Sequence, residues 1–367
     1  MKPLASLITR RCILPCKPSG THRHLLGLIS VAILFGAGVL SASPPAHAQQ
    51  LFIGDTASSA NLVQEFNGSS GAYRGVFVPS GSAGLDGPMG MIYTNGELVV
   101  VNQNVHQSYN GEIFRFDGKT GTFIGKLVAY SDINAPFAPR GIVRGGPDNA
   151  FYVADLGSDC ASQGNIKVYN DAGAFAGNLD RSGFASGFFP RGLVFGPDGL
   201  LYVSAIACPT ADKRDLLAGY ILRFNASTKA FVDVFATNQT VPDLHRPEGL
   251  VFDKEGNLWI TSFRASASDS DKIPKLNGKT GALLDKLVLS APMTPRAYAQ
   301  AILFGPGDKL YIPISGLDSS TAGQLRRCNV KTKVCDIVAP AGNPLQAPYY
   351  LIFKNSDPAT LGYGENE

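Results

Sequence analysis

The chain has 367 residues and a formal net charge of +3, but that charge is unevenly distributed. Residues 1–48 hold five Lys and Arg and no acidic residue, so the rest of the chain carries 27 basic and 29 acidic residues, a net charge of −2. That remainder shows no basic run or basic–aromatic patch, which argues against nucleic acid as a partner.

Residues 1–48 are predicted to be a signal peptide. A positive leader precedes the apolar run 25–40, and Ala46-His47-Ala48 offers small residues around a cleavage point. The alternative is a membrane anchor, although the run is shorter than the ~20 residues of a span. Arg10-Arg11 lies far from the run and indicates twin-arginine export only weakly. We expect a secreted or periplasmic protein with no membrane span after cleavage.

A recurring phrase organises the rest of the chain. It reads Pro-x-Gly, an apolar run, a turn with Gly and a second apolar run, at spacings of 51, 51 and 57 residues. Short strands at such a period predict a propeller or another repeat array. The copies begin at Pro88, Pro139, Pro190 and Pro247, with degenerate copies around Tyr298 and Pro348.

Each copy is predicted to form four strands. In the first, 90–93 and 97–101 flank Asn95-Gly96, a pair that favours a tight hairpin turn. Segments 113–116 and 122–128 follow, without helical periodicity. The next copies repeat this plan, with first strands at 141–143, 192–195, 249–252 and 301–304.

The two ends of the chain complete each other. The segment after the leader begins with a second strand, 51–55, and continues with 61–66 and 73–78, while the missing first strand lies at 349–353. Pairing the ends removes a free sheet edge. We therefore predict an all-β, six-bladed β-propeller of four-stranded blades over 49–367, closed by a shared blade. A parallel β-helix is the alternative, but its coils are shorter and would not split a repeat.

The repeated pattern, written out at Pro190-Arg191-Gly192-Leu193-Val194-Phe195, resembles the NHL-repeat and gluconolactonase-like six-bladed propellers over residues 51–354. Virginiamycin B lyase-like and strictosidine-synthase-like proteins have a similar plan. WD-repeat and kelch propellers fit less well, because Trp259 is the single Trp and no Trp-Asp or Gly-Gly signature recurs.

The gluconolactonase resemblance implies a divalent metal held by Glu, Asn and Asp near the starts of the innermost strands. Only Glu248 suits a hard metal here, and two arginines occupy equivalent positions, which counts against a metal lactonase. The virginiamycin B lyase resemblance would imply a His and a Glu near a metal; His245 and Glu248 lie three apart without a second His motif. The equivalent positions hold Met89, Arg140, Arg191, Glu248, Gln300 and Tyr349.

Four cysteines remain after the leader, and in an exported chain they predict disulfides. Of the three pairings we favour Cys160–Cys208, in equivalent loops of adjacent blades, and Cys328–Cys335, across a hairpin. Their spacing does not match a zinc site.

The long polar loops are all expected on one face, where binding to a rigid scaffold usually occurs. Arg140 and Arg191 share one repeat position and are predicted to meet an acidic group of a small or peptidic ligand. The alternative is that they pair with Asp155 or Glu248. Arg246 and Arg296 belong to the same face. The predicted binding set is Arg140, Arg191, Glu248, Asn102, His106, Asp155, His245 and Tyr349.

No cofactor is predicted. Asp269 and Asp271 could hold calcium through their oxygen atoms, with a solvated acidic loop as the alternative. His106 and His245 fit loop or surface positions better than catalytic bases. No G-x-S-x-G, H-E-x-x-H, phosphate-loop or dinucleotide motif is present.

The main functional prediction is an exported propeller that binds a small molecule, a peptide or another exported protein on its loop-rich face. The alternative is a hydrolase of esters or lactones, or a lyase, at the mouth of the central channel. A structural or surface-assembly module is a third class. Two arginines and one acid at the inner-strand starts favour binding over metal-dependent hydrolysis, and fold resemblance alone does not establish catalysis.

Overall fold

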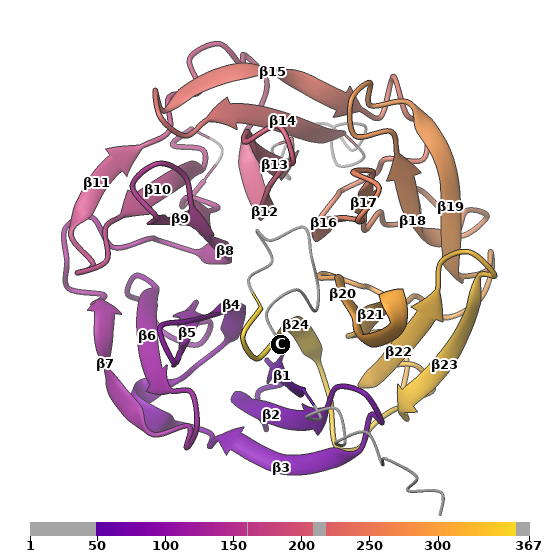
Figure 1. Ribbon diagram of the computed structural model, residues 1–367, viewed down its shortest axis with the longest axis horizontal. Helices are drawn as coiled ribbons and strands as arrows, with labels where there is room; N and C mark the ends of the chain where they lie inside the picture. The colour runs from indigo at the N-terminus through magenta and orange to yellow at the C-terminus, as the bar shows by residue number, and fades with distance from the viewer. Residues whose placement is uncertain (1–48, 160, 208–217, 357–367) are drawn as a thin grey trace, which may run out of the picture. The chain divides into compact units, whose positions relative to one another are not determined.

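The computed structural model describes residues 49–159, 161–207 and 218–356. These residues form six antiparallel sheets of four strands each, arranged around a central axis (Figure 1). The six-bladed propeller predicted from the repeats is therefore confirmed, and the β-helix alternative is wrong, because every ladder is antiparallel and lies within one repeat. No helix in the described part of the chain is long and apolar enough to cross a membrane.

Each blade runs from an innermost to an outermost strand. Blade 1 has β4 (Pro88–Thr94), β5 (Glu97–Asn102), β6 (Glu112–Asp117) and β7 (Phe123–Val128); blade 2 has β8 (Pro139–Gly145), β9 (Ala150–Asp155), β10 (Asn165–Tyr169) and β11 (Phe175–Asn178); blade 3 has β12 (Phe189–Phe195), β13 (Leu201–Ile206), β14 (Gly219–Asn225) and β15 (Ala230–Thr237).

The second half of the ring follows the same order. Blade 4 has β16 (Leu250–Phe252), β17 (Leu258–Ile260), β18 (Asp271–Leu276) and β19 (Leu283–Ser290); blade 5 has β20 (Leu303–Gly305), β21 (Lys309–Ile314), β22 (Gln324–Asn329) and β23 (Val334–Ala339); the closing blade has β24 (Pro348–Phe353), β1 (Gln50–Asp55), β2 (Leu62–Asn67) and β3 (Tyr73–Val78). Among the described residues, single 3-10 turns lie at Ser82–Gly84 and Pro306–Asp308.

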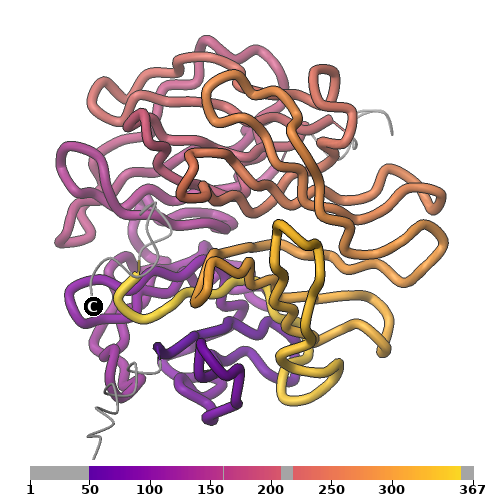
Figure 2. Tube along the Cα trace, turned by 45° about the vertical axis from the view of Figure 1, so that its right-hand side comes forward, coloured from indigo at the N-terminus to yellow at the C-terminus, as the bar shows by residue number. Residues whose placement is uncertain are grey.

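The closing blade joins the two ends of the propeller. β1 pairs antiparallel with β24, with Leu51 opposite Phe353 and Gly54 opposite Tyr350. Figure 2 shows the indigo N-terminal strands beside the yellow C-terminal strand, as the ladder requires. The split repeat predicted from the sequence is thus confirmed. β24 covers the edge of β1 that would otherwise have no partner strand.

The Pro-x-Gly phrase sets how closely the innermost strands approach. A Cβ on Gly141 would lie 2.7 Å from the carbonyl oxygen of Arg191, and a Cβ on Gly90 would lie 2.6 Å from that of Arg140. Adjacent innermost strands therefore pack backbone against backbone, which no larger residue permits without movement. The predicted hairpin turn also forms, with positive φ angles at both Asn95 and Gly96.

Apolar residues of the first three strands fill the spaces between blades. The largest buried side chains include Trp259, Tyr152, Tyr202 and Tyr311, one or more from each of blades 2 to 5. Cys328 and Cys335 form the predicted disulfide across the β22–β23 hairpin, with 4.0 Å between their Cα atoms. Cys160 and Cys208 lie outside the described residues, so their predicted pairing stays a prediction.

Candidate functional site

Side chains from the starts of the innermost strands, at the middle position of the repeated phrase, meet at the centre of the ring. Arg140 donates a hydrogen bond from Nη1 to Oε1 of Gln300 at 3.0 Å. Blades 2 and 5 lie on opposite sides of the ring (Figure 1), so this hydrogen bond crosses the axis. Arg191 Nη1 lies 3.4 Å from Glu248 Oε1, between neighbouring blades 3 and 4. Polar side chains from four blades therefore occupy the axis.

This axial group is buried and charged. The side chains of Arg191 and Glu248 are only 14% and 6% exposed. Burial lowers the pKa of Arg191, Glu248 raises it, and the positive charges of Arg140 and Arg246 lower it again. Arginine nevertheless stays protonated at physiological pH. The pKa shift therefore reports that three guanidinium groups share one environment with a single carboxylate.

Tyr350 brings a neutral hydroxyl into the same group. Burial raises the pKa of Tyr350, and the negative charge of Glu248 raises it further, so the phenol keeps its proton. Its hydroxyl has no hydrogen-bond partner among the residues that the structure describes. Tyr350 replaces the glycine of the repeat in the closing blade, so this hydroxyl has no equivalent in the blades that keep the glycine.

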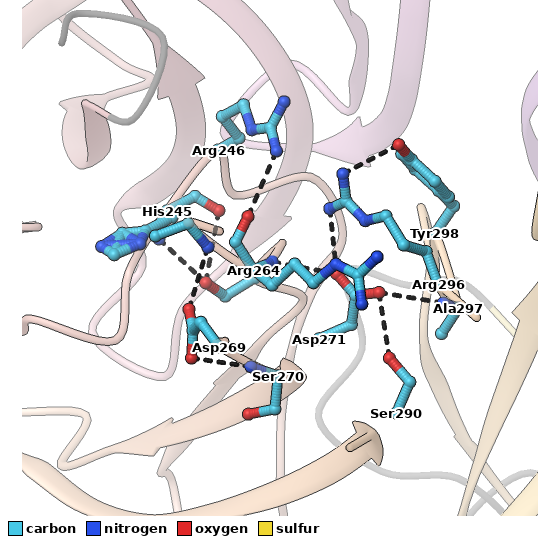
Figure 3. Close-up of polar contacts among 12 residues, drawn as sticks. His245, Arg246, Arg264, Asp269, Ser270, Asp271, Ser290, Arg296, Ala297 and Tyr298 are labelled. Atoms are coloured by element: carbon cyan, nitrogen blue, oxygen red, sulfur yellow. Dashed lines mark hydrogen bonds and ion pairs between the residues drawn. The ribbon is translucent and has the colours of Figure 1, made fainter. Parts of the chain in front are cut away.

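A second group of arginines comes from the loops of blades 4 and 5 (Figure 3). Arg296 contacts Asp271 through Nη2 at 3.0 Å and donates from Nη1 to the Tyr298 hydroxyl at 2.8 Å. Arg246 donates from Nη2 to the carbonyl of Arg264 at 3.3 Å. Burial lowers the pKa of Arg246, and the charge of Arg296 lowers it further. Within the described part of the chain no carboxylate pairs with Arg246.

We call Arg140, Arg191, Arg246 and Arg296 the arginine centre. The two groups are electrostatically connected. The charge of Arg246 lowers the pKa of Arg191, and the charge of Glu248 raises the pKa of Arg246. The centre has two carboxylate neighbours, Glu248 and Asp271, which leaves a formal charge of +2. The Nε atoms of all four arginines are buried and lack a partner within the described residues. Buried unsatisfied donors are costly, and an acceptor anion would satisfy them.

Asn102 and Asp155, both in the predicted binding set, anchor loops. Asp155 is buried at the end of β9, and its carboxylate accepts hydrogen bonds from the backbone N–H groups of Phe137 at 2.9 Å and Ala138 at 2.8 Å. Asn102 ends β5 in the same way and accepts from the N–H of Asp86 at 2.7 Å. Both hold the loop that leads into the innermost strand of their own blade. Of the alternative in which Arg140 and Arg191 pair with Asp155 or Glu248, the Arg191–Glu248 pair forms, and Asp155 binds backbone N–H groups instead of an arginine.

The two histidines and Tyr349 lie around the mouth rather than in the axial contacts. His106 is half-exposed, with Nδ1 2.7 Å from Asp86 Oδ1. His245 lies beside the second arginine group (Figure 3), where burial lowers its pKa and the charge of Lys272 lowers it further. Tyr349 is half-buried and close enough to raise the pKa of Tyr350 slightly. A direct ligand role for these residues stays a prediction.

The residues predicted to hold calcium are already paired with cations. Lys272, itself buried, places Nζ 2.6 Å from Asp269 Oδ1. Burial opposes ionisation of Asp269, but the hydrogen bonds from Lys272 and from two backbone N–H groups outweigh it and lower its pKa to about 2. Asp271 is 1% exposed and bound to Arg296, so the expected solvated acidic loop is wrong at this position.

The donor set at the axis does not suit a divalent cation either. Besides the neutral Tyr350 hydroxyl, Gln300 and Glu248 supply the oxygen atoms there, and both face a guanidinium group. In addition, the described residues contain no cluster of three or more His, Cys, Asp or Glu that could hold a metal ion. Hard cations prefer several converging oxygen ligands, so the residues present fit an anion better than the metal that the family resemblance implies.

Comparison with solved structures supports the fold. The chain is similar to a periplasmic gluconolactonase from Pseudomonas aeruginosa (15% identity, TM-score 0.50, covering 83% of this chain and 99% of that one). It is also similar to a luciferin-regenerating enzyme (16% identity, TM-score 0.51, covering 79% and 86%) and to virginiamycin B lyase from Staphylococcus aureus (17% identity, TM-score 0.49, covering 81% and 82%).

No protein-family model matches the sequence, and no curated protein sequence matches it significantly. The six four-stranded sheets and the similarity to these solved structures confirm the resemblance to gluconolactonase-like six-bladed propellers at the level of the fold. Identities this low carry no activity from one protein to another.

Proposed function

We propose that this protein is an exported ligand-binding propeller whose arginine centre binds a small molecule or peptide through a carboxylate. The observation that carries the proposal is the imbalance of charge at the mouth: four arginines face two carboxylates, and all four buried Nε donors lack partners in the described structure. Guanidinium groups match carboxylates in geometry and bind them by charge-assisted hydrogen bonds.

The contacts of the arginine centre also suit the replacement of Glu248 by a ligand carboxylate as the partner of Arg191. Arg191 and Glu248 touch through one long contact of 3.4 Å, and the second carboxylate oxygen of Glu248 has no partner among the described residues. A ligand carboxylate would compete with this weak internal pair rather than with a bidentate one. Export is supported by the predicted leader and by the Cys328–Cys335 disulfide, since such bonds persist in oxidising compartments.

The test is isothermal titration of carboxylates into the exported protein at constant ionic strength. We expect binding by the wild type and a loss of at least about tenfold in the axial triple variant R140A/R191A/E248Q, because charge-assisted bonds contribute about 1.5–3 kcal/mol each. The Glu248→Gln change avoids leaving a buried unpaired carboxylate. The matched control is Arg115→Ala, which removes an arginine paired with Glu97 away from the axis.

Three results would count against the proposal. If the wild type binds no carboxylate, or if the axial triple variant binds as tightly as the wild type, the arginines do not form a ligand site. If the triple variant also loses much of its stability, they are structural ion-pair partners.

A hydrolase or lyase at the same mouth is the second candidate. It is favoured by one observation: a carboxylate oxygen of Glu248 and the Tyr350 hydroxyl are buried beside the arginines, and neither has a hydrogen-bond partner among the residues that the structure describes. Such groups could accept and donate a proton next to a bound carboxylate. Proton release or absorbance change with lactones, esters and β-substituted acids, with and without chelator, separates turnover from simple binding.

A further inference from the structure

Five exposed apolar side chains lie in two neighbouring loops on the loop-rich face of blade 1. Ile133 is 93% exposed and Phe137 is 46% exposed, and the other three are each about two-fifths exposed. Single exposed apolar residues are ordinary, but here they gather in two neighbouring loops, β5–β6 and β7–β8. We call these residues the apolar rim: Val105, Tyr109, Tyr130, Ile133 and Phe137.

The apolar rim is held together by specific contacts between its two loops. The rings of Tyr109 and Tyr130 lie 4.3 Å apart. The N–H of Gly111 donates to the carbonyl of Pro136 at 2.8 Å, which ties the β5–β6 loop to the segment before Phe137. Tyr169 of blade 2 donates from its hydroxyl to the carbonyl of Asn134 at 2.7 Å. The two loops are therefore tied to each other and to blade 2.

The rim borders the arginine centre. Phe137 precedes Arg140 by three residues, a chain length of at most about 10 Å. On its other side, Val105 packs over Gly87, where a Cβ would lie 2.7 Å from Val105 Cγ1, and Gly87 is two residues before Met89 of the axial ring. An acidic group at the axis would thus have an apolar surface within reach of a small molecule.

We infer that the ligand is a small amphiphilic carboxylate with an aromatic or branched alkyl body. The acid lies in the arginine centre and the body covers the apolar rim. This inference rests on the proposed function and adds the chemical class of the ligand. Charge complementarity identifies the occupant: an apolar partner without an acid would leave the +2 centre beside it unsatisfied.

The experiment compares acetate, butyrate, 4-phenylbutyrate and the uncharged 4-phenylbutanol by titration calorimetry at constant ionic strength. In the wild type we expect affinity to rise by up to about fourfold per buried methylene, with 4-phenylbutyrate the tightest and 4-phenylbutanol far weaker. The rim variant I133S/F137S should lose roughly tenfold for 4-phenylbutyrate and little for acetate. Leu317→Ser, another exposed apolar residue on a different loop, is the matched control.

The outcomes separate this inference from the proposed function. If acetate and 4-phenylbutyrate bind equally and the rim variant matches the wild type, the inference is overturned while carboxylate binding stands. If 4-phenylbutanol binds as tightly as the acid, the rim acts without the arginines and the two-part site is wrong. If no carboxylate binds, the proposed function itself fails. A wild-type dimer that I133S/F137S dissociates in sedimentation would show that a second copy covers the rim, and would also overturn the inference.

Discussion

Replacing Gly141 by Ala should destabilise the propeller, because Gly141 is a contact point between innermost strands. The added Cβ would lie 2.7 Å from the Arg191 carbonyl oxygen and 3.2 Å from the Gly192 Cα, and both are backbone atoms that cannot rotate away. Relief requires β8 and β12 to separate by a few tenths of an ångström. Overpacking of this kind costs about 1–3 kcal/mol of unfolding free energy.

The matched control is Gly125→Ala on the outermost strand of blade 1. Gly125 does not have a positive φ angle, and a Cβ there would have no atom within 4 Å. Losing backbone freedom in the unfolded chain should make this variant neutral or more stable by about 0.4–1 kcal/mol. Urea denaturation of the wild type and both variants gives the comparison. Equal stability of the two variants would refute the close backbone packing of the innermost strands.

Three further predictions concern closure, acid stability and the disulfide. Truncation before Pro348 removes β24 and exposes the edge of β1, so the product should unfold or aggregate; a product that melts like the full chain would contradict the split blade. Despite burial, hydrogen bonds from Lys272 and backbone N–H groups lower the pKa of Asp269 from 3.8 to about 2, so its contribution to stability is present above pH 3.8 and is lost as the pH falls towards 2. The D269N variant should therefore show a flatter dependence of stability on pH in this range. An unchanged dependence would contradict the pairing of Asp269 with Lys272. The C328S/C335S variant should lose about 2–3 kcal/mol in denaturation, as expected for so short a loop, and peptide mapping of unreduced protein should recover a Cys160–Cys208 link if the second predicted pairing forms.

The fold could be predicted because its signals are local and repeated. Asn95-Gly96 specifies its own turn, and the Pro-x-Gly phrase marks each innermost strand wherever blades must approach closely. The partner of β1 could be found by elimination, since 349–353 was the one first strand without a repeat of its own.

The site was only partly predictable for the opposite reason. Arg140 and Arg191 share a repeat position, and the repeat identified them. Arg246 and Arg296 were assigned to the right face but not to the site, because they lie in loops that do not repeat and their proximity depends on the ring. Tyr350 departs from the repeat, and that departure was the signal available in the sequence for a special role.

Buried charge was the hardest property to predict. Asp269 and Asp271 looked like a solvated or calcium-binding loop, since neighbouring acids in a Ser-rich segment usually face water. The partner of Asp271 is Arg296, 25 residues further along the chain and in the next inter-blade loop. Such pairs arise from the tertiary fold, and neither residue spacing nor composition predicts them.

The central claim is that the arginine centre binds a ligand acid, and one titration tests it most directly. 4-Phenylbutyrate is titrated at constant ionic strength into the wild-type protein and into the R140A/R191A/E248Q variant. We expect the wild type to bind one molecule per chain and the variant to bind with an affinity at least about tenfold lower. Equal affinities in the two proteins would contradict the claim.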